Sequence, residues 1–202
     1  METIDKLTEL FKHFPGIGPR QAKRFVYFLL TRNKSYLKDL TNLIEELPNE
    51  VSICKECFRY FAKGKQATTL CNICAGKNRD LDTLMVVARD IDLENVEKSH
   101  SFNGKYFVLG GTVPILDKNP ETKVRLKELV SLVDKKKIKE IILGFSVNPE
   151  SEYTAQFIIK ALNPLTIKHN IKISHLGRGL STGTELEYSD SDTIKSAFEN
   201  RK

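Results

Sequence analysis

The chain has 202 residues, of which 40% are hydrophobic and 29% charged, so it can form one large domain or a few small ones. No long apolar run occurs, so no membrane span is expected, and the acidic start METIDKLTEL differs from a secretory signal, which predicts a cytoplasmic protein. The net charge is +6, with 14 Lys and Arg against 9 Asp and Glu in residues 1–80 and 18 against 17 in residues 81–202. The basic first part suggests an anionic partner, nucleic acid before a membrane surface, although a solvated basic face would look the same.

The first part of the chain predicts a small helical module. Apolar residues recur at helical spacing over residues 1–13, and Pro15 interrupts the pattern. Pro19 suits the first position of a second helix, PRQAKRFVYFLLTR. We expect a third helix that Ser35 caps and Pro48 closes.

The stretch FPGIGPRQAKRF, residues 14–25, joins the first two helices. Glycine lets a ligand approach the backbone, and the second helix points its N-terminal amides and the positive end of its dipole at the same place. The candidate DNA-binding residues are Gly16, Gly18, Arg20, Lys23 and Arg24. The three cations share one helix face and include no evident base-reading group, so binding should be independent of sequence and sensitive to salt. A helical hairpin that merely needs a tight turn is the alternative, but helix, PGIGP and basic helix in this order resemble helix-hairpin-helix DNA-binding modules.

All four cysteines lie in one stretch, CKECFRYFAKGKQATTLCNIC. Two C-x2-C pairs stand thirteen residues apart and supply the candidate metal ligands Cys54, Cys57, Cys71 and Cys74. Four thiolates favour a closed tetrahedral site for structural Zn²⁺. Disulfides are not expected in a cytosolic chain, and iron–sulfur clusters usually have a more compact ligand spacing. Because residues 51–80 hold few large apolar side chains, metal binding should supply much of the local folding free energy.

Strands alternate with helices after the cysteines. The predicted strands are TLMVVAR (83–89), YFVLGG (106–111), KEIILGF (139–145) and IKISHLG (171–177). The predicted helices are DLENVEKS (92–99), ETKVRLKELVSLVDKKK (121–137), ESEYTAQFIIKAL (150–162) and the tail DSDTIKSAFENRK (190–202). This alternation predicts a parallel α/β sheet covered on both faces, so the fold class is α/β with small helical and zinc modules.

The order of these parts resembles the RecR family of bacterial recombination mediators over essentially the whole chain. The resemblance rests on FPGIGPRQAKR, the two C-x2-C pairs, VLGG followed by a proline, NPESEYTA and HLGRGLSTGTELEYSD. It implies four segments: a helix-hairpin-helix DNA-binding module (1–52), a C4-type zinc finger (53–80), a Toprim-like α/β domain (81–176) and a C-terminal assembly segment (177–202). Toprim is the fold shared with topoisomerases and bacterial primases.

The resemblance also implies a function. Family members form ring-shaped tetramers that encircle or clamp DNA. They work with RecO, and in many bacteria with RecF, to load RecA recombinase onto single strands coated by single-strand-binding protein. We therefore expect a non-enzymatic DNA clamp of recombinational DNA repair, and the lack of a Walker-type phosphate loop predicts no ATP hydrolysis by the chain itself.

The Toprim resemblance raises the alternative of a magnesium-dependent DNA enzyme, such as a topoisomerase, a primase-like protein or a nuclease. Active Toprim proteins carry a Glu at the end of the first strand and an acidic cluster after a later strand, and such carboxylates bind Mg²⁺. Ala88 stands where that Glu is usual, with Arg89 beside it. The residues left for a residual acidic site are Asp90, Asp92, Glu150 and Glu152, which could equally favour helix N-termini. An incomplete carboxylate site gives no basis for catalysis and makes the binding of Mg²⁺ doubtful. A third possibility is a zinc-stabilised RNA-binding module, because nothing in the hairpin distinguishes DNA from RNA.

Overall fold

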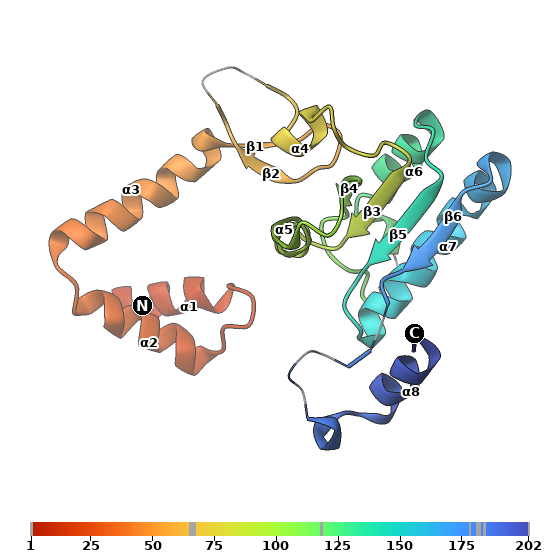
Figure 1. Cartoon of the computed structure of the whole chain (residues 1–202). Coiled ribbons are helices and arrows are strands. Elements are labelled where there is room, and N and C mark those ends of the chain that lie inside the picture. The colour runs from red at the N-terminus through yellow and green to blue at the C-terminus, as the bar shows by residue number, and fades with distance from the viewer. Residues whose placement is uncertain are drawn as a thin grey trace. The chain divides into compact units, whose positions relative to one another are not determined.

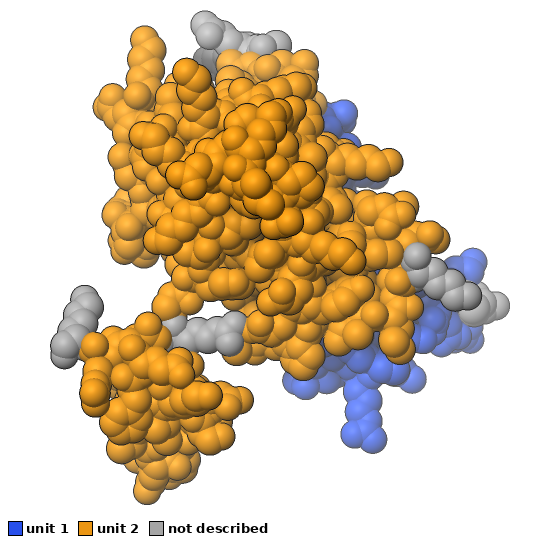
Figure 2. Space-filling model, turned by 90° about the vertical axis from the view of Figure 1, so that its right-hand side faces the viewer, with its two compact units in different colours: residues 1–51 blue, residues 52–202 orange. Residues whose placement is uncertain are grey.

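The computed structural model describes residues 2–64, 68–117, 119–177, 179–180, 183 and 185–201. It divides into two compact units, residues 1–51 (unit 1) and 52–202 (unit 2), which Figure 2 colours separately. Unit 1 is helical, whereas unit 2 holds the cysteines and a four-stranded sheet (Figure 1). No helix in the described part of the chain has the length and apolar character needed to cross a membrane.

Unit 1 is built from three helices: α1 (Thr3–Lys12), α2 (Pro19–Leu30) and α3 (Lys34–Glu50). The ring of Phe11 meets those of Phe14 and Phe25 edge-on, with centroids 5.5 and 5.8 Å apart. Ala22 and Val26 on α2 are the buried residues of these helices. These aromatic contacts join α1, the hairpin loop and α2, and they fix the conformation of the hairpin.

The ends of α3 differ from the prediction. Asn33, and not Ser35, caps the helix, because the Asn33 side-chain oxygen accepts a hydrogen bond of 2.8 Å from the Tyr36 N–H. Pro48 does not close the helix but lies inside its last turn, and α3 ends at Glu50. Proline lacks the N–H that would bond to the carbonyl four residues earlier, so the last turn of α3 continues past one missing hydrogen bond.

Unit 2 begins with the cysteine-bearing elements. They are the paired strands β1 (Val51–Ile53) and β2 (Tyr60–Ala62), followed by the short helix α4 (Asn72–Ala75). The four-stranded sheet comes next, with all strands parallel in the order β4–β3–β5–β6. Its strands are β3 (Thr83–Val87), β4 (Lys105–Val108), β5 (Glu140–Gly144) and β6 (Lys172–His175). The four predicted strands and the parallel α/β fold are therefore confirmed.

The helices of unit 2 follow the strands in alternation. They are α5 (Asp90–Ser99), α6 (Leu126–Lys135), α7 (Pro149–His169) and α8 (Ser191–Glu199), with short 3₁₀ turns η1 (Pro120–Thr122) and η2 (Leu186–Tyr188). Helix α7 runs beyond its predicted end at residue 162, through Pro164 to a left-handed C-cap at Asn170. The predicted tail helix is confirmed as α8, which the Asp190 side chain caps.

The two faces of the central strands contact different partners. Leu84 and Val86 on β3 belong to a core that includes residues of α6 and α7. Met85 and Val87 face the other way, into a second core with Leu93 of α5 and three of the cysteines. The cysteine-bearing elements therefore pack against the sheet and share its hydrophobic core.

The predicted long helix over residues 121–137 is confirmed only in its central part, because α6 covers Leu126–Lys135. The chain forms η1 and then α6, and Arg125 between them adopts a non-helical ψ of 53°. The Arg125 N–H donates to the Leu109 carbonyl at 2.9 Å, and its guanidinium donates to the Val108 carbonyl at 3.0 Å. These bonds to the end of β4 replace the helical ones, so tertiary contacts override the local amphipathic pattern.

Candidate nucleic-acid interface and metal centre

The hairpin between α1 and α2 uses its two glycines differently. Gly16 has φ +75°, a left-handed conformation that L side chains rarely adopt. Gly18 is the N-cap of α2 with ordinary extended angles, φ −82° and ψ 169°. A Cβ atom built on either glycine would meet nothing within 4 Å. Neither the backbone nor the packing of unit 1 therefore requires glycine at position 18, which leaves that backbone open to an outside group.

The start of α2 is electropositive. Pro19 occupies the first turn, and the Ala22 N–H donates to the Gly18 carbonyl at 2.9 Å. The preceding N–H groups of Arg20 and Gln21 have no partner within a helix of this geometry. The first turn of α2 carries no acidic residue, so no carboxylate within that turn offsets the positive end of the helix dipole.

The predicted cations lie around this helix start. Arg20, Lys23 and Arg24 are all exposed. Arg24 donates a long hydrogen bond of 3.3 Å to Gln21, whereas Arg20 and Lys23 have no ion pair with a described acid of unit 1. Such cations can bind an anion. They follow Gly18 within the first two turns of α2, so they lie near the part of the backbone that a ligand can approach.

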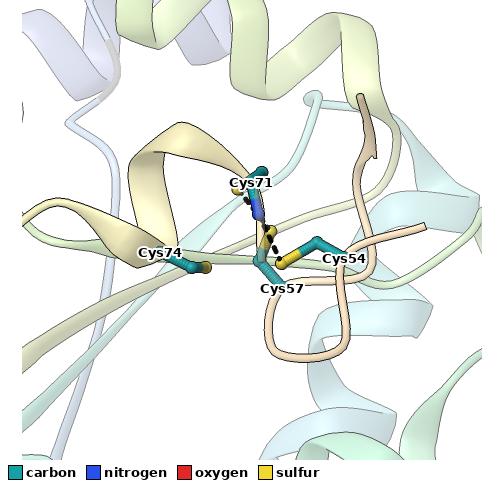
Figure 3. A group of neighbouring side chains, drawn as sticks. All are labelled: Cys54, Cys57, Cys71 and Cys74. Atoms are coloured by element: carbon teal, nitrogen blue, oxygen red, sulfur yellow. Dashed lines mark hydrogen bonds between the residues drawn. The ribbon is translucent and has the colours of Figure 1, made fainter. Parts of the chain in front are cut away.

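The four cysteines converge, as Figure 3 shows. Their sulfur atoms all lie within 4.8 Å of one another, and those of Cys57 and Cys71 are 3.6 Å apart. A disulfide needs an S–S length of about 2.05 Å, whereas tetrahedral Zn–S bonds of about 2.3 Å place sulfurs roughly 3.8 Å apart. The donor set and its spacing therefore fit one metal ion, and the group could hold one.

Local hydrogen bonds shape the first cysteine turn. The Phe58 N–H donates to the Cys54 carbonyl at 3.0 Å, and Phe58 adopts φ 60°, which turns the chain back after Cys57. The Cys71 N–H donates to the Cys54 sulfur at 3.4 Å, so the two pairs are joined even without considering a metal. Amide donors of this kind stabilise a thiolate ligand.

Burial and crowding affect the ionisation of the sulfurs. A hydrogen bond to the Cys71 sulfur, together with burial, raises the pKa of Cys57. The group cannot carry four thiolate charges on its own, whereas a bound dication would offset them and displace the protons.

Two residues that the sequence pattern did not single out hold this centre in place. The Lys105 ammonium donates to the carbonyls of Ile73, Cys74 and Gly76 at 3.0, 3.0 and 3.4 Å, so it fixes the second cysteine turn. Arg125 reaches the Phe58 carbonyl at 3.5 Å as well as the end of β4. The only sequence signal was a lysine at the start of a buried strand and an arginine inside an amphipathic run.

The predicted acidic residues have structural hydrogen bonds. Asp90 accepts from the Tyr60 N–H at 2.7 Å, and Asp92 accepts from the Arg89 N–H at 3.0 Å. Glu150 accepts from the Thr112 hydroxyl. Both acidic pairs follow neighbouring parallel strands, β3 and β5, yet among the described residues only the cysteines gather three or more metal-ligating side chains.

The predicted C-terminal assembly segment is described only in part. Residues 178, 181, 182, 184 and 202 lie outside the described residues. Glu185 precedes η2 and Glu187 lies in it, and both are exposed.

Comparison with known proteins agrees with this geometry. Residues 4–47 match the family model "RecR, helix-hairpin-helix", residues 82–177 match "Toprim domain", and residues 179–202 match "RecR, C-terminal". A helix-hairpin-helix module, a four-cysteine group and a Toprim sheet in one chain define the class of bacterial recombination proteins. The recombination protein RecR of Legionella pneumophila (strain Corby) is 36% identical over 201 residues, which cover 100% of this chain and 98% of that protein. RecR of Prochlorococcus marinus (strain MIT 9515) is 34% identical over 198 residues, 98% of this chain and 94% of that protein.

The chain belongs to the RecR family of recombination proteins. This membership supports a role in recombinational repair of DNA.

Proposed function

We propose that the chain is a non-enzymatic DNA clamp that grips the sugar–phosphate backbone through the hairpin between α1 and α2. The observation that carries the proposal is the backbone at Gly18, which has ordinary angles and open space at the positive end of α2. A phosphate can approach such a backbone, accept hydrogen bonds from the N–H groups of the first turn, and meet Arg20, Lys23 and Arg24. Since no base edge is read, the grip is independent of sequence.

The same proposal extends to assembly and partners. Several copies of the chain, as a homo-tetrameric ring, would present several hairpins to one DNA molecule and multiply a weak grip. In this role the protein acts with RecO, and with RecF where the cell has it, to help load RecA on single-stranded DNA. The segments 1–52, 53–80, 81–176 and 177–202 then serve as the DNA-binding module, the metal module, the Toprim scaffold and the assembly segment.

The metal in this proposal is structural Zn²⁺ held by the four cysteines. The support is the four-sulfur donor set, which packs against the sheet and contains no histidine or carboxylate among the residues that the structure describes. Metal analysis of the purified protein should find one zinc per chain; iron in its place would contradict this assignment.

A Toprim enzyme is the weaker candidate, because Asp90 and Asp92 already accept backbone hydrogen bonds and Ala88 stands at the position of the usual Glu. Relaxation or cleavage of plasmid DNA in the presence of Mg²⁺ would favour the enzyme.

The hairpin is tested by charge reversal. Arg20→Glu with Lys23→Glu should abolish DNA retention in a gel-shift assay at low salt, while helicity and solution mass stay unchanged. Lys34→Glu with Lys38→Glu, two exposed lysines on α3, is the matched control and should retain DNA. Equal binding by both variants would refute the role of the hairpin.

A further inference from the structure

A second basic surface lies on unit 2, between the first cysteine pair and α6. A cavity of about 420 Å³ is lined there by four lysines, which we call the lysine groove: Lys55, Lys127, Lys135 and Lys136. Two acids, Glu56 and Glu128, also line it. The groove therefore carries a net positive charge, and none of its residues belongs to the hairpin of unit 1.

Helix α6 places its lysines along one stripe. Lys127, Ser131 and Lys135 are four residues apart, so they lie on the same side of the helix, and all three line the groove. With a rise of 1.5 Å per residue, the two lysines are separated by about 12 Å along the helix axis. They can thus meet different phosphates of one strand, while Lys55 faces them from the cysteine-bearing turn.

Three of the four lysines form no ion pair with the acids of the described chain. Lys136 pairs with Glu56 at 3.1 Å, but Lys55, Lys127 and Lys135 are exposed and have no ion pair with an acid in the described part of the chain. A neighbouring cavity of about 460 Å³ shares Glu56, Leu132 and Lys136 with the groove.

That second cavity extends the basic surface. It adds Lys77 and Lys137, both exposed, whereas its third additional lysine, Lys105, is engaged by backbone carbonyls. Its further acid, Asp82, pairs with Lys139 at 2.5 Å. The cationic surface thus continues around the C-terminal end of α6.

The wall of the groove includes an aromatic ring. Phe58 is half-buried and lines the cavity, with its ring centroid 5.3 Å from that of Phe107 in the core. Grooves that hold single strands combine flexible cations for the phosphates with aromatic side chains for the bases. We propose that the lysine groove is a second contact surface for single-stranded nucleic acid, which rests on the proposed function and adds a strand path across unit 2.

The test is the salt dependence of binding to a fluorescent oligo-dT strand, followed by anisotropy. Each phosphate that the protein no longer neutralises should lower the slope of log K against log salt by about 0.7 for a single strand. The triple variant Lys55→Gln, Lys127→Gln, Lys135→Gln should therefore bind more weakly, with a slope reduced by about 2. The matched control neutralises three exposed lysines of α5, α7 and α8, Lys98→Gln, Lys160→Gln and Lys195→Gln, and should keep the native slope.

The hairpin variant Arg20→Gln with Lys23→Gln, measured alongside, separates this inference from the proposed function. Weaker binding in both variants is the expected result and supports both surfaces. Weaker binding in the groove variant alone supports the groove and refutes the hairpin. Weaker binding in the hairpin variant alone, with the groove variant equal to its control, overturns the groove. If the groove variant binds oligo-dT normally but no longer binds poly-glutamate, the surface serves an acidic protein and the inference is again overturned.

A smaller variant covers the case in which a low zinc content shows that the triple variant misfolds. The double variant of α6, Lys127→Gln with Lys135→Gln, is then measured in the same way, with an expected slope change of about 1.4.

Discussion

At the residue scale, Gly16 and Gly18 form a matched pair in the sequence but have separate roles in the structure. Gly16 is required by its left-handed backbone, so Gly16→Ala should lower the free energy of unfolding by about 1–2 kcal/mol. Gly18 has angles that alanine adopts readily, so Gly18→Ala should leave thermal stability equal or slightly raised. Its new methyl group should nevertheless weaken DNA binding severalfold, because it stands where a phosphate would approach.

Thermal melts and oligonucleotide anisotropy of the two variants measure stability and binding separately. A Gly18→Ala protein that binds DNA like the parent would show that no ligand comes close to this backbone.

Lys105 is the second residue whose role only the structure reveals. Its ammonium bonds to three carbonyls of the second cysteine turn, so Lys105→Met should leave these acceptors without their donor and loosen the metal site. Groups that orient metal ligands typically contribute 10- to 100-fold to affinity, and we expect a loss of about that size in competition with a chromophoric zinc chelator. Lys77→Met is the control, since Lys77 is exposed beside the same cavity and has no such bonds among the described residues. Equal zinc affinity in both variants would show that Lys105 does not help to position the second cysteine turn.

At the element scale, the cysteine-bearing elements and the sheet share one hydrophobic core, so we expect them to fold together. The Val108 N–H at the end of β4 donates to the Cys57 carbonyl at 2.8 Å, and three cysteines share a core with Leu93 of α5. Removing the metal with a chelator should therefore raise hydrogen exchange in β4 and α5 as well as in residues 54–75, while the centre of α7 stays protected. Exchange that rises only within the cysteine-bearing residues would mean that the module is energetically independent of the sheet.

The sequence predicts some elements better than others, and the reason is physical. Apolar runs such as those of β3 and β5 identify strands because a parallel sheet buries both of its faces. The cysteine spacing likewise predicts the four-sulfur group, because C-x2-C pairs are local. The break before α6 was not predictable, since Arg125 leaves the helix for carbonyls of β4 and the first cysteine turn, which are distant in sequence. The core that the cysteine-bearing elements share with the sheet was not predictable either. Few large apolar residues lie near the cysteines, and those that complete this core come from distant parts of the sequence.

At the scale of the whole molecule, unit 1 leaves much of its apolar surface uncovered. Helix α3 has no buried residue, and Leu43, Ile44 and Leu47 are 62%, 56% and 57% exposed. Such a surface suits contact with another protein surface, which in the proposed ring is supplied by a second copy of the chain. Leu43→Asp with Leu47→Asp should then lower the solution mass measured by light scattering, while zinc content and the fold of unit 2 remain.

The loss of assembly should also be a loss of DNA binding, because a single hairpin contacts few phosphates and linked copies raise the effective concentration of the next hairpin. Affinity for a long strand should fall by roughly 10²–10⁴, whereas affinity for a strand too short to reach a second hairpin should change little. Leu116→Asp with Ile167→Asp, which alters residues 94% and 75% exposed in unit 2, is the control and should keep both mass and affinity. A variant that becomes monomeric yet holds long DNA as tightly as the parent would show that each chain binds alone, and multivalent clamping would then have no part in the function.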